Sequence, residues 1–402
     1  MNHVETRDAT FRRSVYGSLY PLAEWIAFNW WFLTTSIRPS ATDSRYWTWP
    51  NVRAQQWLRH HNMRGAGDGM AWPDFTLVPE GPVTCMRWFA DDDTLFGPVQ
   101  FVSAGTAFVK SEDVATGLAE FVDHVLERLA EEGLPKTRLA EDWAALGNLD
   151  DDEKEFCATA ARLGVDPFSL SELLAREIID VANGLPAELV TEFFDNADAT
   201  NLGKAAEWTC RASEVATMAS ASARDLKSLY EVVSPHVESG KNAVDLPWEA
   251  GYAMARRVRH ELDTSDTHPF DVSPWLALGE VRDDSGGIQG VAAVNNNRCG
   301  LVLGDPGLRE ESRLFAQARA LGRALVRPGQ RSFLLSAARS RDERVAGAFA
   351  AELLAPAKGI REVLDGLGKQ DDMALEAAAR SFGVSPLVVR RQYDNQLART
   401  SL

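Results

Sequence analysis

Two helical patterns, separated by a short break that contains proline and glycine, constrain the second half of this 402-residue chain more than any other feature. In the first pattern, residues 309–327, apolar side chains such as Leu321 and Leu325 recur at helical spacing and fall on one face. Pro328 ends this pattern because proline cannot continue the hydrogen-bond ladder. The second pattern covers residues 341–355. Both are rich in alanine, so we expect two closely packed helices.

Arginines recur four residues apart along the first pattern, in two sets: Arg309 and Arg313, then Arg319, Arg323, Arg327 and Arg331. Residues four apart share one face of a helix. A charged run at this spacing is usually a face in contact with water. The spacing alone therefore predicts that these arginines are exposed.

The phrase ERVAGAFAAELLAP, which starts at Glu343, resembles the second metal-binding helix of the ImmA/IrrE family of metallopeptidases. In that family the first helix carries His-Glu-x-x-His in a phrase similar to AHELGH, and the corresponding phrase in this chain reads ARALGR. The resemblance places Arg319 and Arg323 at the two histidine positions and Ala320 at the position of the general base. It places Glu343 at the third metal ligand.

These substitutions remove the groups that zinc hydrolysis requires. A catalytic zinc ion needs about three neutral or anionic protein ligands and a base that takes a proton from the bound water. A guanidinium stays protonated and has no free lone pair for a metal. The resemblance therefore implies a zincin-like fold with no metal, no cofactor and no peptidase activity. It also implies that Arg319 and Arg323 face inward, where a pair with Glu343 would replace the metal as the link between the two helices.

Charge and cysteine content narrow the class of protein. The formal net charge is −16, which disfavours direct nucleic-acid binding. The four cysteines are far apart and form no CxxC pair, so neither a zinc ribbon nor a disulfide framework is predicted. The apolar run from Val15 to Ile37 contains Pro21, Glu24 and Asn29, which predicts a buried helix rather than a membrane span. We expect a cytoplasmic protein with reduced thiols.

We predict an α+β fold that is mainly helical, in three parts. Residues 1–135 are a tryptophan-rich α/β module, residues 136–245 a helical region, and residues 246–402 the zincin-like ImmA/IrrE domain. In the first part we expect a meander of three or four strands, over Thr76–Val78, Val83–Phe89, Val99–Val102 and Ala107–Val109. A helix over Ser111–Glu132 should follow it. We interpret the tryptophans as core residues rather than a nucleic-acid stacking surface.

The last part carries two further patterns. Residues 290–294 and 300–304 have the composition of strands in a small sheet. Residues 375–386 predict a helix, a glycine turn and a second helix, and we interpret this helix-turn-helix pattern as structural support rather than a DNA reader.

Three functions agree with these observations. We expect a non-catalytic regulatory protein that acts on a protein partner, and the resemblance points to phage defence, toxin–antitoxin systems or mobile-element control. An alternative is an active metallo-endopeptidase that cleaves a helix-turn-helix repressor, with Glu343 joined by Asp305, Glu310 or an N-terminal histidine as ligands. A second alternative is a sensor of a small anion or nucleotide, which Arg319 and Arg323 would bind in the vacated metal cleft.

Limited proteolysis tests the predicted boundary near residue 245. The stretch 240–247 lies between helical patterns and is small, polar and glycine-containing, so a protease should cut there first. Mass spectrometry should then detect a C-terminal product of roughly 155 residues. A full-length chain that resists cleavage in this stretch would contradict a flexible link.

Overall fold

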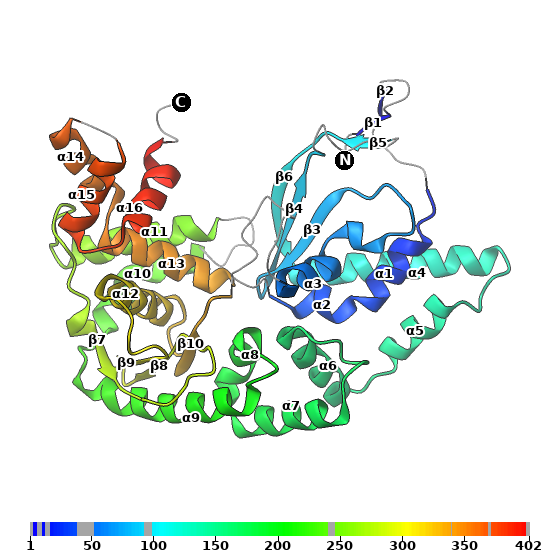
Figure 1. Cartoon of the computed structure of the whole chain (residues 1–402), viewed down its shortest axis with the longest axis horizontal. Helices are drawn as coiled ribbons and strands as arrows, with labels where there is room; N and C mark the ends of the chain where they lie inside the picture. The colour runs from blue at the N-terminus through cyan, green and yellow to red at the C-terminus, as the bar shows by residue number, and fades with distance from the viewer. Residues whose placement is uncertain are drawn as a thin grey trace. The chain divides into compact units, whose positions relative to one another are not determined.

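The computed structural model describes eight stretches of the chain: residues 3–5, 10–12, 17–37, 52–91, 99–239, 246–338, 340–368 and 371–398. Its fold is α+β and mainly helical, as the sequence predicts (Figure 1). The chain divides into two compact units. Unit 1 contains Met1–Ala175 and Ala338–Ser340, and unit 2 contains Arg176–Ala337 and Arg341–Leu402. Residues 240–245, where the sequence predicts a link, lie outside the described stretches, so the three-part division stays a prediction.

Unit 1 combines two small sheets with helices. Its elements in chain order are β1 (His3–Glu5), β2 (Thr10–Arg12), α1 (Tyr20–Phe28), α2 (Trp30–Thr35), α3 (Val52–His61), β3 (Asp74–Pro79), β4 (Val83–Phe89), β5 (Val99–Phe101), β6 (Gly105–Lys110), α4 (Ser111–Glu131), α5 (Arg138–Gly147) and α6 (Asp151–Leu163). Three of the four predicted strands form the expected antiparallel meander, β3-β4-β6. The fourth, β5, does not join it but pairs with β1, because the N-terminal residues supply a partner strand that the sequence pattern did not reveal.

The core of unit 1 lies between α1, α4 and the meander. Trp25 of α1 and Trp57 of α3 are buried, which supports their interpretation as core residues. The apolar run after Val15 is two helices, because the chain turns at Asn29, whose buried side chain donates a hydrogen bond to the carbonyl of Trp25 (2.8 Å). Among the described helices, none combines the length and apolar character that a bilayer span requires.

Unit 2 is built on one mixed sheet and a larger set of helices. Its elements are α7 (Glu172–Gly184, which begins at the end of unit 1), α8 (Ala187–Asn196), α9 (Leu202–Ala219), α10 (Lys227–Ser239), α11 (Pro247–Glu261), β7 (Leu276–Gly279), β8 (Gly290–Asn295), β9 (Arg298–Leu303), α12 (Glu310–Val326), β10 (Ser332–Leu335), α13 (Arg341–Leu354), α14 (Ala357–Leu367), α15 (Asp372–Phe382) and α16 (Pro386–Gln392). The two strands predicted over 290–304 are confirmed as β8 and β9. The predicted helix, glycine turn and helix are confirmed as α15 and α16, with Gly383 at φ +67° between them.

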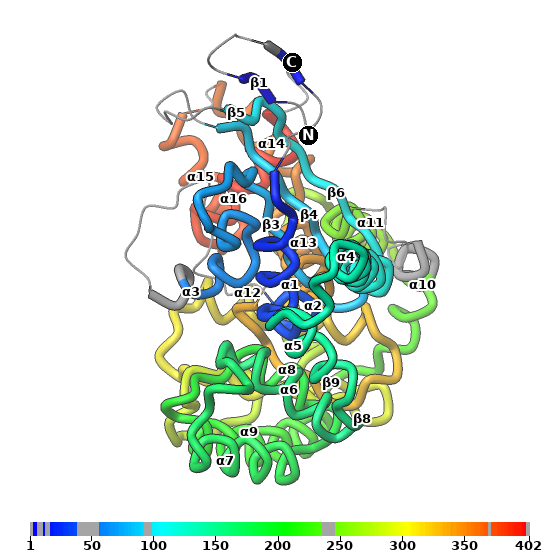
Figure 2. The backbone as a smooth tube through the Cα atoms, turned by 90° about the vertical axis from the view of Figure 1, so that its right-hand side faces the viewer, coloured from blue at the N-terminus to red at the C-terminus, as the bar shows by residue number. Residues whose placement is uncertain are grey.

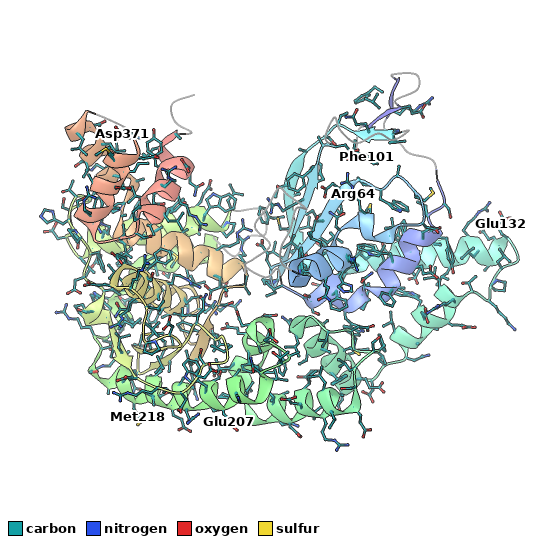
Figure 3. The ribbon with its side chains drawn as sticks, in the orientation of Figure 1. Arg64, Phe101, Glu132, Glu207, Met218 and Asp371 are labelled. Atoms are coloured by element: carbon teal, nitrogen blue, oxygen red, sulfur yellow. The ribbon has the colours of Figure 1, made fainter. Side chains whose placement is uncertain are left out.

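The sheet of unit 2 has the strand order β10-β8-β9-β7 and is antiparallel except between β7 and β9. Helix α9 covers one face and α12 lies against the other (Figures 1 and 2). On the α9 face, Gly300 permits the contact, because a Cβ there would come within 1.9 Å of the Ala216 carbonyl oxygen. Glu207 and Met218 of α9 are exposed and point away from the sheet (Figure 3). Unit 2 therefore takes in helices that the sequence-based division assigns to residues 136–245.

The opposite face of the sheet holds the main core. Ala292, Leu301 and Phe333 are in register on neighbouring strands, so successive side chains of each strand alternate between the α9 face and this core. Helices α12 and α13 pack together over it, as the two alanine-rich patterns predict. Strand β10 is the edge strand on this side, and its position brings the loop after it next to both helices.

Candidate functional site

Arg319 and Arg323 lie one turn apart on α12, on the side that meets α13. The Arg323 side chain is 3% exposed and the Arg319 side chain 17%. The prediction from spacing, a run of arginines in contact with water, is therefore wrong for these two residues. It holds for Arg309 and Arg313, which are exposed. Burial of two of the arginines follows from the packing of α12 against α13, which the charge spacing does not encode.

Arg319 binds Glu343 and the end of strand β10. One terminal nitrogen donates to Glu343 Oε2 (2.6 Å) and to the Ser336 carbonyl oxygen (2.5 Å), and the other donates to Gln289 Oε1 (3.2 Å). Glu343, which is buried, accepts a further hydrogen bond from the Ser336 amide through Oε1 (3.2 Å). Arg319 and Glu343 therefore join α12, α13 and the end of β10.

Arg323 lies at the centre of a carboxylate cluster. One terminal nitrogen donates to Asp342 Oδ2 (2.9 Å) and the other to Glu192 Oε1, while Nε is 3.8 Å from Glu343 Oε1. The guanidinium carbon lies 5.3 Å from the centre of the Phe333 ring, within the range of a cation–π contact. The structure thus brings all three predicted site residues together and adds Glu192 and Asp342.

Charge balance explains how these groups tolerate burial. Burial alone would lower the pKa of Arg323, but the neighbouring Glu192, Glu343 and Asp342 raise it above the ordinary value of arginine. Arg327, which is half-exposed, also pairs with Asp342. Three arginines thus face three carboxylates. A buried charge without such partners would be costly, so the members of this cluster depend on one another.

Helix α8 connects the cluster to the free edge of the sheet. Three amides of β10 and the loop after it point away from β8, and a carboxylate accepts a hydrogen bond from each: Ser332 to Glu188 (3.0 Å), Leu334 to Glu192 (2.7 Å) and Ser336 to Glu343 (3.2 Å). Unpaired edge amides are a template for pairing with another chain. Glutamates from α8 and α13 here take the place of a neighbouring strand.

Sequence reasoning missed Glu192 and Asp342 for different reasons. Asp342 directly precedes Glu343 in the acidic first turn of α13. The sequence therefore showed where it lies, but the motif comparison assigned a role to Glu343 alone. Glu192 is 131 positions from Arg323, on a helix with no motif, and only the packing of α8 against β10 brings it to the cluster.

The structure also bears on the metal site and the anion-binding site that the sequence left as alternatives. The described residues contain no group of three or more His, Cys, Asp or Glu side chains arranged to hold a metal ion, so Glu343, Asp305 and Glu310 do not form one there. A pocket of about 320 Å³ lies beside Arg319, but Asp305 also lines it. Both terminal nitrogens of Arg319 already bind protein acceptors. This arrangement favours the internal ion pair over an anionic ligand.

Comparisons with known proteins add no further identification. No protein-family model matches the chain, and no curated protein matches it. The resemblance to the ImmA/IrrE family therefore rests on the residues quoted above alone.

Arg323→Met tests the cluster energetically. The change should lower the free energy of unfolding of unit 2 by about 1–3 kcal/mol, because it leaves buried carboxylates without their positive partner. Urea unfolding of the full chain measures the loss. Arg313→Met is the matched control: it removes an exposed arginine from the same helix and should cost less than about 0.5 kcal/mol.

A double-mutant cycle separates the ion pair from general packing loss. Adding Glu192→Gln to Arg323→Met should recover part of the loss, with a coupling energy of at least about 0.5 kcal/mol. Glu343→Gln, combined with Arg323→Met in the same kind of cycle, should also recover part of the loss. If the single changes cost almost nothing and their effects simply add in both cycles, these arginines are not held by the carboxylates.

Proposed function

We propose that unit 2 is a zincin-like domain that has lost its metal and acts as a non-catalytic binding or regulatory module. One observation carries this proposal: a buried guanidinium, Arg323, is held by carboxylates from two helices at a position where the resemblance puts a metal-binding histidine. The cluster supplies the link between α12 and α13 that a metal would otherwise supply.

The residues around the cluster support loss of catalysis. Ala320, at the position of the general base, is fully buried and has no group that can take a proton. Arg319 and Arg323 would repel a divalent cation rather than bind it. Glu343, at the third ligand position, already bonds Arg319 and the Ser336 amide.

Binding of a protein partner is the function that remains for such a domain. Active members of the family that it resembles cleave helix-turn-helix repressors, so a version without catalysis would bind a regulator of this kind without cutting it. The proposed setting is cytoplasmic control of mobile elements, a toxin–antitoxin pair or phage defence, and it comes from the resemblance alone. The peptidase and anion-sensor alternatives have weaker support. Within the described stretches the candidate ligands are not gathered, and the arginines already have internal partners.

Restoring the family motif tests the proposal. Protein purified without chelator should hold no stoichiometric zinc, whereas the triple variant Arg319→His, Ala320→Glu and Arg323→His should gain about one zinc per chain with Glu343 as third ligand. Elemental analysis measures both. Arg309→His with Arg313→His is the control: it places two histidines four apart at the exposed start of α12, from its N-cap residue onward and away from Glu343, and should gain none.

Two outcomes would contradict the proposal. One is about one zinc per chain in the unmodified protein, together with cleavage of an unfolded substrate such as casein that a chelator stops. The other is a folded triple variant without zinc, which would show that the arginines do not stand at metal-ligand positions.

A further inference from the structure

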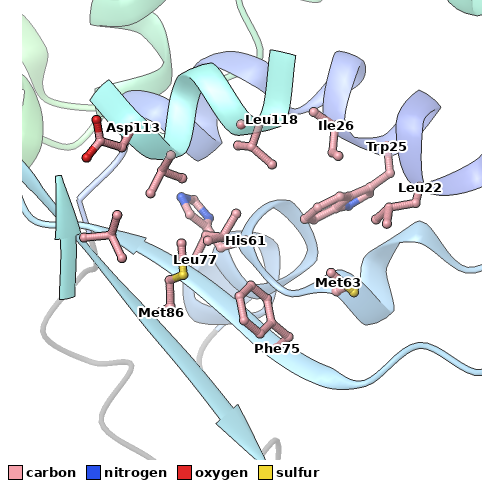
Figure 4. Close-up of a pocket in the computed structure, with 13 residues that line it drawn as sticks. Leu22, Trp25, Ile26, His61, Met63, Phe75, Leu77, Met86, Asp113 and Leu118 are labelled. Carbon is pink, nitrogen blue, oxygen red and sulfur yellow. The ribbon is translucent and has the colours of Figure 1, made fainter. Parts of the chain in front are cut away.

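An apolar pocket inside unit 1 is separate from the arginine cluster and has no role in the proposed function. Its volume is about 250 Å³, and α1, α4 and the β3-β4-β6 meander enclose it (Figure 4). The walls are almost entirely apolar, with Trp25 and Ile26 on one side and Phe75, Leu77 and Met86 on the other. Protein interiors are close-packed and contain few voids larger than a water molecule. A partly open space of this size is therefore left unfilled by the chain's own described side chains.

Water is a poor occupant of this pocket. Buried waters need two to four polar partners, and cavities lined by apolar side chains stay dry and bind apolar molecules instead. His61 is the one buried polar side chain in the lining, and burial lowers its pKa to about 3, so the ring is neutral. Its ring nitrogens lie 2.7 Å from the Trp57 carbonyl oxygen and 3.0 Å from that of Phe32, and the single N–H of the neutral ring donates to one of these two carbonyls.

Gly117 gives the pocket an entrance. It lies inside the 21-residue helix α4, where glycine lowers helix propensity relative to alanine. It is exposed, yet it also lines the pocket. A Cβ added at Gly117 would meet no described atom within 4 Å outside its own helix. Gly117 is therefore a point where the apolar lining meets solvent and where a larger side chain has room.

Asp113 sets the charge at this entrance. It is one turn before Gly117 on α4, is exposed, and lies at one end of the pocket (Figure 4). A carboxylate at the mouth repels an anionic group and attracts a cationic one. Fatty acids and other apolar anions are therefore disfavoured.

We propose that this pocket is a binding site for a small apolar molecule that carries no negative charge, with any polar or cationic end at Asp113. Size limits the ligand further. A cavity of 150 Å³ holds benzene, so the same density gives roughly ten carbon atoms for this one. A fused two-ring aromatic compound has this size, and the adaptable side chains of Met63 and Met86 can fit around it.

Three probes of equal shape and different charge test the proposal on the full chain: 1-methylnaphthalene, 1-naphthylmethylamine and 1-naphthoate. Calorimetry should show saturable binding of the first two. Naphthoate should bind at least about tenfold more weakly than either. Asp113→Asn should remove most of this difference. Absence of saturable binding for all three would overturn the site, and equal affinity of the amine and naphthoate would overturn the role of Asp113.

Changes at Gly117 show where the probes bind. Gly117→Phe places a ring over the entrance and should weaken binding of the neutral probe by about tenfold or more. Gly117→Ala is the control, since it also raises helix propensity over glycine but does not fill the opening, and it should bind as the unmodified protein does. If Gly117→Phe does not fold, Met86→Trp fills the same space from β4 and should also lose binding. Full affinity in a folded blocking variant would place the probe elsewhere and overturn the proposal.

Discussion

Unit 2 depends on the neutralisation of one buried cation, the Arg323 guanidinium. Its side chain is almost entirely removed from water, and its charge is balanced by Glu192 of α8 and by Asp342 and Glu343 of α13. Removing a charge from water is expensive, and in the protein interior attraction to opposite charges offsets that cost only where they are well placed and hydrogen-bonded. The same carboxylates would be unstable there without the arginine. The cluster therefore forms as a unit, and it brings three helices and an edge strand to one place.

The geometry of the sheet edge follows from this requirement. Glu192 and Glu343 each bond one arginine and one outward-facing amide, at Leu334 and Ser336. The arginines thus position the carboxylates that cover the edge of β10. An ion-pair cluster of this kind fixes geometry more than it adds stability, since apolar residues of similar volume often replace such groups without loss. Its role in this chain is to hold α8, α12 and α13 in one arrangement.

The sequence predicted the parts of this arrangement that depend on local pattern. The α+β class, both helices of the site, strands β8 and β9 and three strands of the first meander follow from periodicity and turn residues. Strands β7 and β10 were missed because each has only four residues, too few for an alternating pattern to emerge. The break at Asn29 was also missed, because no glycine or proline stands at that position in the sequence.

The site itself marks the limit of sequence reasoning. Arginine spacing alone predicted an exposed face, and only the resemblance of the second helix to a metal-binding helix indicated that Arg319 and Arg323 point inward. Glu192 lay beyond both arguments, because its place in the cluster depends on the packing of α8 against β10. The pocket of unit 1 was equally invisible, since its walls come from helices and strands distant in the chain.

Amide hydrogen exchange in unit 2, measured residue by residue by NMR in the Arg323→Met variant, tests the central claim most directly. If the arginine holds Glu192 on the sheet edge, exchange should accelerate most at the Leu334 amide, which donates to Glu192. Ser332 and Ser336, whose amides donate to Glu188 and to the Glu343 that Arg319 also binds, should change less. Phe333 and Leu335, whose amides face β8, should keep their protection. Unchanged exchange at Leu334, or equal acceleration of all five amides, would contradict the account.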